Sequence, residues 1–260
     1  MTRWSAHLHM LFKEQPFLER FQAAADRGFS VVECWSPFEV ELDEFEAAVS
    51  AAGVQLAGFN LHSGDMPGGD RGFLNRPAER HDVLANAEDA IALAGRTGTR
   101  NINALAGNQN GGDRAAELYE VVRRLGELGE RAEGSDVTFL VEPLNNLDSP
   151  RYLVNTPDEA AELIGRVGHP RVAMLFDAFQ VARMGLDPVE QLERHLPLVR
   201  HIQIADAPGR HQPGTGEVDY DAFFAALERL GYEGAVGLEY TPADGDDTDA
   251  ALAWLPEAER

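Results

Sequence analysis

The sequence alternates short apolar runs with amphipathic helical patterns along its whole length. Eight runs have the length and composition of buried strands: Trp4–Met10, Val31–Trp35, Gln55–Asn60, Asn101–Leu105, Thr138–Glu142, Val172–Asp177, His201–Ala205 and Ala235–Tyr240. Apolar residues recur at helical spacing between them, for example over Pro16–Arg27 and Tyr220–Leu230. Strands that alternate with helices are parallel and joined by right-handed crossovers. Eight such units predict a closed (β/α)8 TIM barrel of the α/β class.

Helix boundaries and chain length agree with a barrel. Thr156-Pro157-Asp158-Glu159 is typical of a helix start, and Gly53, Gly98 and Gly231 follow helical patterns as expected for helix ends. No linker rich in Ser, Gly or Pro divides the 260 residues, so we expect one domain over residues 1–260. An open doubly wound sheet is the alternative, but no G-x-G-x-x-G follows the first strand.

The composition of the chain argues against nucleic-acid or membrane partners and against secretion. The formal net charge is −22, which repels nucleic acid and anionic membranes. No run is long and apolar enough for a membrane span, and the N-terminus shows no secretory signal. The single cysteine, Cys34, fits a reducing compartment. We therefore expect a cytoplasmic protein that acts on a small molecule.

Four successive predicted strands lead into a side chain that carries a free oxygen. These residues are Glu142, Asp177, Gln203 and Glu239. In a barrel, the strand ends converge at the mouth, where active sites lie. Each acid alone could cap the following helix, but carboxylates that converge repel one another unless a cation neutralises them. Their hard oxygen ligands favour Mg²⁺ or Mn²⁺, so we predict one divalent metal ion.

Several segments of the chain resemble the hydroxypyruvate isomerase family, which belongs to the xylose isomerase-like barrels. The resemblance runs through Ser5–Phe12, Leu140–Asn145, His201–Ala205, Pro208–Tyr220 and Gly237–Tyr240. It implies that Glu142, Asp177, Gln203 and Glu239 bind the metal and that Glu142 and Glu239 are the catalytic pair. The chain departs from the family at Gln180, where relatives commonly carry histidine, and at His7, where they often carry asparagine.

The reaction that the resemblance implies moves a carbonyl group between adjacent carbons. A proton must leave the carbon next to the carbonyl and return to its neighbour. A metal that binds both oxygens acidifies that proton and stabilises the enediolate. One glutamate would act as base and the other as acid, in either order.

Six further residues are candidates for substrate binding. Arg71 and Arg210 lie in the two long loops, and guanidinium forks suit a substrate carboxylate; for Arg71, an ion pair with Asp65, Asp70 or Glu217 is the alternative. Glu33 could bind substrate hydroxyls or form a buried ion pair. The other candidates are His7, His62 and Gln180, although a loop histidine such as His62 is more often solvated.

These observations leave more than one function open. The leading hypothesis is an isomerase that interconverts hydroxypyruvate, or a close 2-oxo acid, with tartronate semialdehyde or its analogue. The alternatives are a ketose 3-epimerase or other sugar isomerase, an endonuclease-IV-like enzyme and a non-catalytic ligand-binding barrel. Relatives often form oligomers, so a homo-oligomer is possible.

Overall fold

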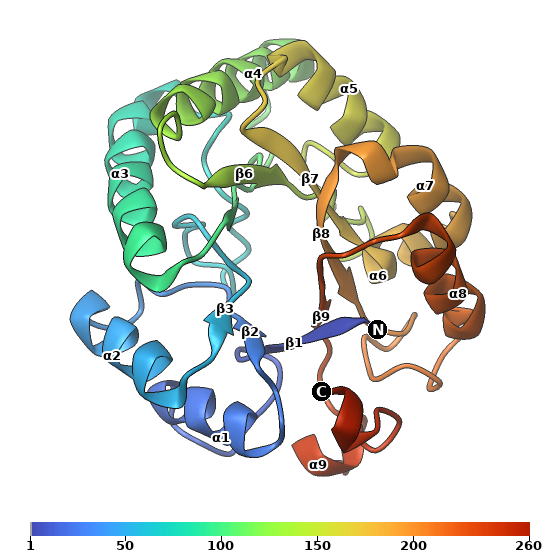
Figure 1. Cartoon of the computed structure of the whole chain (residues 1–260). Coiled ribbons are helices and arrows are strands. Elements are labelled where there is room, and N and C mark those ends of the chain that lie inside the picture. The colour runs from blue at the N-terminus through green and yellow to red at the C-terminus, as the bar shows by residue number, and fades with distance from the viewer. Residues whose placement is uncertain (1) are drawn as a thin grey trace.

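The computed structural model describes residues 2–260 and is a barrel of parallel strands inside a ring of helices (Figure 1). The sheet order is β3-β2-β1-β9-β8-β7-β6-β5-β4. The strands are β1 Arg3–His7, β2 Val31–Glu33, β3 Gln55–Leu56, β4 Gly58–Asn60, β5 Asn101–Asn103, β6 Thr138–Val141, β7 Val172–Asp177, β8 Val199–Ile204 and β9 Ala235–Leu238. The predicted fold class is confirmed.

The two ends of this sheet are halves of one extended segment, so the barrel closes. β3 pairs with β2 and β4 pairs with β5, and only Ala57 separates the two halves. The Ala57 amide donates to the Val32 carbonyl at 2.8 Å, and the Asn60 amide donates to Trp35 at 2.7 Å, which continues the pairing with the β2 side. The predicted strand Gln55–Asn60 is therefore one barrel strand with a local interruption.

Helices cover the outside of the barrel. They are α1 Arg20–Asp26, α2 Leu42–Ala52, α3 Arg80–Thr97, α4 Arg114–Arg131, α5 Pro157–Val167, α6 Ala178–Arg183, α7 Pro188–His195, α8 Tyr220–Leu230 and α9 Thr248–Ala251, with single 3-10 turns at Phe17–Glu19, Pro77–Glu79, Leu196–Leu198 and Glu257–Glu259. The prediction for Tyr220–Leu230 is confirmed to the residue. The predicted helix Pro16–Arg27 begins instead as a 3-10 turn and ends at Asp26.

Local hydrogen bonds explain where α5 begins and ends. The Thr156 side chain accepts from the Glu159 amide at 3.2 Å, and the Glu159 carboxylate accepts from the Asn155 amide at 2.7 Å. In a capping box, the Glu159 side chain would accept from the amide of the cap residue Thr156. Here it accepts from the amide of the preceding residue, Asn155. Both bonds still satisfy free amides at the helix start. Gly168 ends the helix with a φ of 61°, a left-handed conformation that costs glycine little.

The core has an apolar outer layer and a partly polar interior. Phe139, Phe176 and Phe223 are fully buried in the large cluster that includes strand and helix residues. A smaller cluster contains Leu140, Leu175 and Ala173. Side chains two residues apart on a strand face the same side, so Leu140 and Glu142 share one face, as do Leu175 and Asp177. Glu142 and Asp177 therefore face the barrel interior like Leu140 and Leu175, two residues further along each strand toward the mouth.

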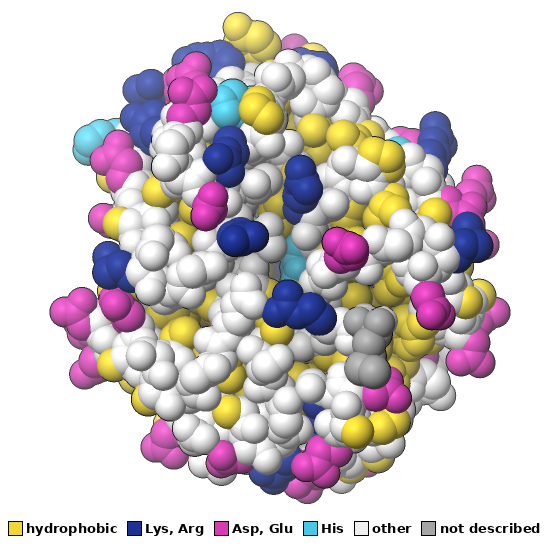
Figure 2. All heavy atoms as spheres, in the orientation of Figure 1, with side chains coloured by type: hydrophobic (Ala, Val, Ile, Leu, Met, Phe, Trp, Pro, Cys, Tyr) yellow, Lys and Arg dark blue, Asp and Glu magenta, His cyan; other side chains and the backbone are white. Residues whose placement is uncertain are grey.

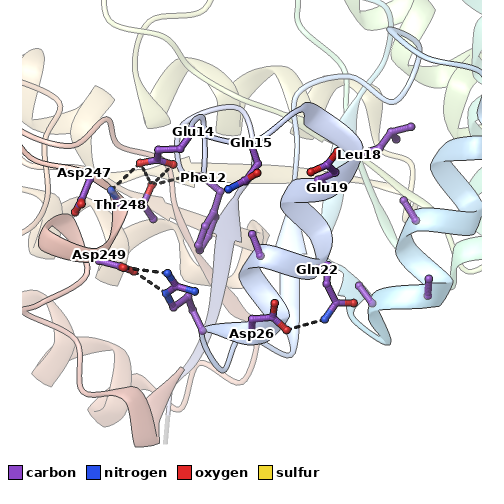
Figure 3. A pocket seen from close by; sticks show the side chains of 15 residues that line it. Phe12, Glu14, Gln15, Leu18, Glu19, Gln22, Asp26, Asp247, Thr248 and Asp249 are labelled. Carbon is purple, nitrogen blue, oxygen red and sulfur yellow. Dashed lines mark hydrogen bonds and ion pairs between the residues drawn. The ribbon is translucent and has the colours of Figure 1, made fainter.

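The C-terminal segment returns to the outside of the first βα unit. Thr248 accepts from the Phe12 amide at 2.8 Å, and Arg27 forms an ion pair with Asp249. These contacts border a hollow of about 590 Å³ outside the barrel. Figure 3 shows them together with side chains that line the hollow, among them Glu14 and Glu19. Over residues 2–260, we find no helix long and apolar enough to cross a membrane.

Candidate active site

Three of the four strand-end residues meet at the barrel mouth. Glu142 follows β6, Asp177 ends β7 and Glu239 follows β9. One carboxylate oxygen from each lies within 4.8 Å of the others, and all three residues are buried. In the sheet, β8 separates β9 from β7, so these strands are not all neighbours. The three carboxylates come close because they occupy inward-facing positions on a closed barrel. The structure thus brings together the acidic residues that the sequence singled out.

Burial and mutual repulsion perturb two of these carboxyl groups. The pKa of Glu142 is raised well above its usual range by burial and then by the charges of Glu239 and Asp177. The pKa of Asp177 is raised to about 7 by burial and then by Glu239. Asn103 donates to Glu142 Oε2 at 2.7 Å, which favours the ionised form but does not reverse the shift.

Glu239 is held from two sides. Its Oε1 accepts from the Trp35 indole nitrogen at 2.5 Å, and its Oε2 accepts from Arg210 Nη2 at 2.7 Å. His7 Nε2 lies 3.6 Å from Oε1. Burial lowers the pKa of His7 to about 3, so His7 is neutral near pH 7. These contacts fix the orientation of the Glu239 carboxylate and leave His7 behind it, in contact with a candidate catalytic residue.

The fourth strand-end residue, Gln203, is oriented by Glu33. Gln203 Nε2 donates to Glu33 Oε1 at 2.8 Å, and His201 Nε2 lies 2.7 Å from Glu33 Oε2. β2 and β8 are not neighbours in the sheet, so these bonds cross the barrel interior. Burial opposes ionisation of Glu33, yet the His201 and Gln203 contacts hold its pKa below the usual range. The sequence leaves a buried ion pair and substrate binding open for Glu33, and its burial against His201 in the barrel interior favours the buried pair.

Three buried side-chain oxygens in or next to the cluster have no hydrogen-bond partner among residues 2–260: Asn103 Oδ1, Asp177 Oδ2 and Gln203 Oε1. Asn103 donates to Glu142 through its nitrogen, and Gln203 lies opposite Asp177 in the pairing of β7 with β8. Buried polar atoms are nearly always paired, so these oxygens need another group as a partner. Because Gln203 turns its nitrogen toward Glu33, its oxygen is the atom left for that group. Three carboxylates and one amide oxygen form a donor set that suits a hard divalent cation, and the cluster could hold one.

A cavity of about 280 Å³ opens over the carboxylates. Glu142 and Glu239 line it, together with Arg71, Arg210 and Gln180. Arg71 Nε donates to Ser149 at 3.1 Å and Nη1 donates to two backbone carbonyls. Within residues 2–260 it forms no ion pair, unlike Arg210, which pairs with Glu239 and lies over the Phe179 ring at 5.1 Å. Arg71 thus places a positive charge at the cavity without a protein counterion.

Gln180 lies at the cavity wall in an amide network. Its Oε1 accepts from the Asn145 backbone at 2.9 Å and from Asn145 Nδ2 at 2.5 Å. Gln180 is therefore held at the cavity wall through its oxygen, which leaves its side-chain nitrogen free to donate. The sequence analysis placed Asn145 in the Leu140–Asn145 segment of the resemblance but gave it no role, because a single Asn after Glu-Pro-Leu has no distinctive spacing.

The structure does not bring His62 to this cavity. His62 is exposed and stacks near Phe73, with ring centroids 6.1 Å apart. It lines a separate hollow with Phe73 and Asn86. His62 follows β4, but its side chain turns outward, and a role in substrate binding has no support from this position.

Asp206 was also missed by the sequence analysis, although it organises the loop that carries Arg210. Its buried carboxylate accepts from five backbone amides: Ala207, Gly214, Thr215, Gly216 and Val218. The Arg210 amide also donates to the Asp206 carbonyl at 2.8 Å. The only sequence signal was an acid at the start of a long Gly/Pro-rich loop, which is common in loops without such a role.

Replacing Asp206 with alanine is expected to lower the free energy of unfolding by about 2–3 kcal/mol, because several partly buried amides lose their acceptor. Urea unfolding measures the change. Glu228→Ala, an exposed site on α8, is the matched control and should stay within about 0.5 kcal/mol of the original protein. An Asp206→Ala loss no larger than that of the control would show that water replaces the carboxylate without penalty.

Comparisons of this chain with family models, curated proteins and solved structures point to one family. The model of the xylose isomerase-like TIM barrel family matches residues 21–258. A putative hydroxypyruvate isomerase of Streptomyces coelicolor is 36% identical, covering 99% of this chain and 97% of that protein. A 2-oxo-tetronate isomerase of Cupriavidus necator is 35% identical, covering 98% of each. A Brucella melitensis structure titled AP endonuclease, family 2 has a TM-score of 0.93 and 33% identity, covering 98% of each chain.

Proposed function

This chain belongs to the hydroxypyruvate isomerase family of the xylose isomerase-like TIM barrels and is an isomerase, and we propose that its substrate is a small hydroxy-2-oxo acid such as hydroxypyruvate. The product from hydroxypyruvate would be tartronate semialdehyde. The observation that carries the proposal is the meeting of Glu142, Asp177 and Glu239 under a cavity that also holds Arg71.

Glu142 and Glu239 are the proposed proton carriers. Both line the cavity, so a substrate carbon above the cluster lies within reach of both carboxylates. One removes a proton from the hydroxyl-bearing carbon, and the carbonyl carbon receives a proton in return. The hydroxyl proton passes at the same time to the former carbonyl oxygen, so that the two carbons exchange their carbonyl and hydroxyl groups. Glu142 is suited to hold a proton because its pKa is raised by burial and by its acidic neighbours. The contacts of Trp35 and Arg210 keep Glu239 in one orientation during the exchange.

Glu142, Asp177, Gln203 and Glu239 would hold the divalent cation, which we propose to be Mg²⁺ or Mn²⁺. When bound, such a cation polarises the substrate carbonyl and makes the adjacent C–H bond more acidic. Glu33 takes part as a positioning residue, since it accepts from Gln203 Nε2 and thereby presents the amide oxygen to the cluster.

Arg71 is the proposed anchor for the substrate carboxylate. Its guanidinium lines the cavity and no protein carboxylate neutralises it within residues 2–260, whereas Glu239 already engages Arg210. A fork of N–H donors binds a carboxylate in one orientation. Substituting Arg71 therefore tests recognition of the substrate carboxylate more directly than substituting Arg210, because loss of Arg210 would also disturb Glu239.

A nucleic-acid substrate fits these features less well. The chain carries a formal charge of −22, which opposes the approach of a phosphate backbone. Across residues 2–260, one group of His, Cys, Asp and Glu side chains has the spacing of a metal site, and none of its members is a histidine. We therefore favour a small-molecule isomerase over a phosphodiester-cleaving enzyme.

Arg71→Ala is expected to raise the KM for hydroxypyruvate by roughly 10- to 100-fold with a smaller change in kcat, because a charge-assisted contact to the substrate is lost. Steady-state assays with hydroxypyruvate, 2-oxo-tetronate and the neutral ketoses D-psicose and D-tagatose measure this effect. Arg166→Ala, an exposed arginine on α5, is the matched control and should leave KM unchanged. Turnover of neutral ketoses alone by the unaltered enzyme would overturn the proposed substrate class in favour of a sugar epimerase.

A further inference from the structure

The end of the barrel opposite the carboxylate cluster contains a hollow of about 490 Å³ ringed by arginines. Arg3, Arg100, Arg171 and Arg200 line it, each within one residue of the start of a strand. Figure 2 looks onto this end and shows Lys and Arg side chains around a central depression with a histidine inside it. The lining includes His201 and shares no residue with the active-site cavity.

These four arginines lack the carboxylate partners that most of the chain's other arginines have. Arg27 and Arg229, for example, each pair with a carboxylate on another element. Within residues 2–260, none of the four around the hollow forms an ion pair, although the chain has 44 acidic residues against 22 basic ones. Arg3 donates to Gln55 at 2.7 Å, and Arg171 has only a long contact of 3.5 Å to a carbonyl. Four positive charges around one hollow outnumber the two carboxylates that also line it, Asp136 and Glu233, and this excess of positive charge favours an anion.

The remaining wall is polar and carries acceptors as well as donors. Asn101 and Thr138 supply an amide and a hydroxyl, and Asp136 and Glu233 supply carboxylates. Guanidinium groups bind phosphate or carboxylate by paired hydrogen bonds, while amide, hydroxyl and carboxylate side chains bind hydroxyl groups. The volume is within the range of small-ligand sites.

We propose that this hollow is a second binding site, for a small anion that also carries hydroxyl groups. The phosphate or carboxylate group would lie between the arginines, and the hydroxyls would meet the amide and acidic side chains of the wall. This proposal does not rest on the proposed isomerase reaction, because the hollow shares no lining residue with the active-site cavity.

The test is calorimetric titration of the metal-loaded full chain with glucose 6-phosphate, with gluconate and with uncharged glucose. We expect at least one of the two anions to bind, with affinity that falls as salt is added, and we expect glucose to show no binding at the same concentrations. Arg100→Ala combined with Arg200→Ala should weaken anion binding about tenfold or more. Binding of only one anion identifies its charged group as the one recognised.

Three controls make the result decisive. Arg166→Ala removes an exposed arginine outside the hollow and should bind the anion as the original protein does. Arg71→Ala should also leave this binding intact, which separates the hollow from the active-site cavity. The double variant should keep its melting temperature and its isomerase activity, because both side chains are exposed. Absence of binding by both anions, unchanged binding in the double variant or loss of binding in Arg71→Ala would each overturn the proposal.

Discussion

Glu142→Gln and Glu239→Gln are each expected to lower kcat for the isomerisation by about a thousandfold. Glutamine keeps the size and an oxygen of the glutamate, but it cannot take up or release a proton near neutral pH. The geometry supports a shared role, since both carboxylates line one cavity and belong to one cluster. The measurement is steady-state kinetics with hydroxypyruvate, alongside metal analysis of each variant.

The matched control for these variants is Glu162→Gln on the exposed face of α5, which should retain full activity. Metal content separates a lost proton carrier from a lost metal ligand, because both glutamates would contact the cation. If either variant bound metal normally and stayed within about tenfold of the original kcat, the proposed proton transfer between Glu142 and Glu239 would be wrong.

Removing divalent metal with a chelator is expected to abolish turnover and to lower the melting temperature by about 5 °C or more at pH 8. A cation at 100 times its dissociation constant stabilises the folded state by roughly 3 kcal/mol, which corresponds to several degrees in a chain of this size. Readdition of Mg²⁺ or Mn²⁺ should restore both properties. Thermal melts and assays before and after chelation check this expectation.

The effect of chelation on stability should grow as pH rises. In the metal-free protein, Asp177 has its pKa raised to about 7, so between about pH 4 and pH 7 the folded state binds more protons than the unfolded state. The stability of the metal-free protein therefore falls as pH rises through that range. A cation replaces the proton, so the difference in melting temperature with and without metal should be larger at pH 8 than at pH 5.5.

Asp177→Asn is the companion variant for this pH series. It removes one titrating group and one negative charge from the cluster, so its metal-free form should show a weaker fall in stability between pH 5.5 and pH 8. Equal pH dependence in the metal-free original and variant proteins would show that Asp177 does not titrate as its surroundings indicate.

Much of the fold followed from periodicity and local signals. Apolar runs, helical stripes and capping residues depend on neighbours along the chain, so β7 Val172–Asp177 and α8 Tyr220–Leu230 were predicted with their observed bounds. The first strand was predicted too long, to Met10, because apolar side chains continue after the chain has turned at His7. Pairing on both sides of Gln55–Asn60, which closes the barrel, is a property of distant strands and has no local signal.

For the candidate site too, some features follow from local sequence signals and others only from the tertiary structure. The sequence by itself determined the barrel class and singled out the four strand-end residues Glu142, Asp177, Gln203 and Glu239 as candidates, because strand ends and residue chemistry can be read locally. Only the tertiary structure decided that Glu33 accepts from the Gln203 amide nitrogen, that His62 faces another hollow and that Asp206 holds the loop of Arg210. These outcomes depend on side-chain directions and on hydrogen bonds across the barrel, between residues far apart in the chain.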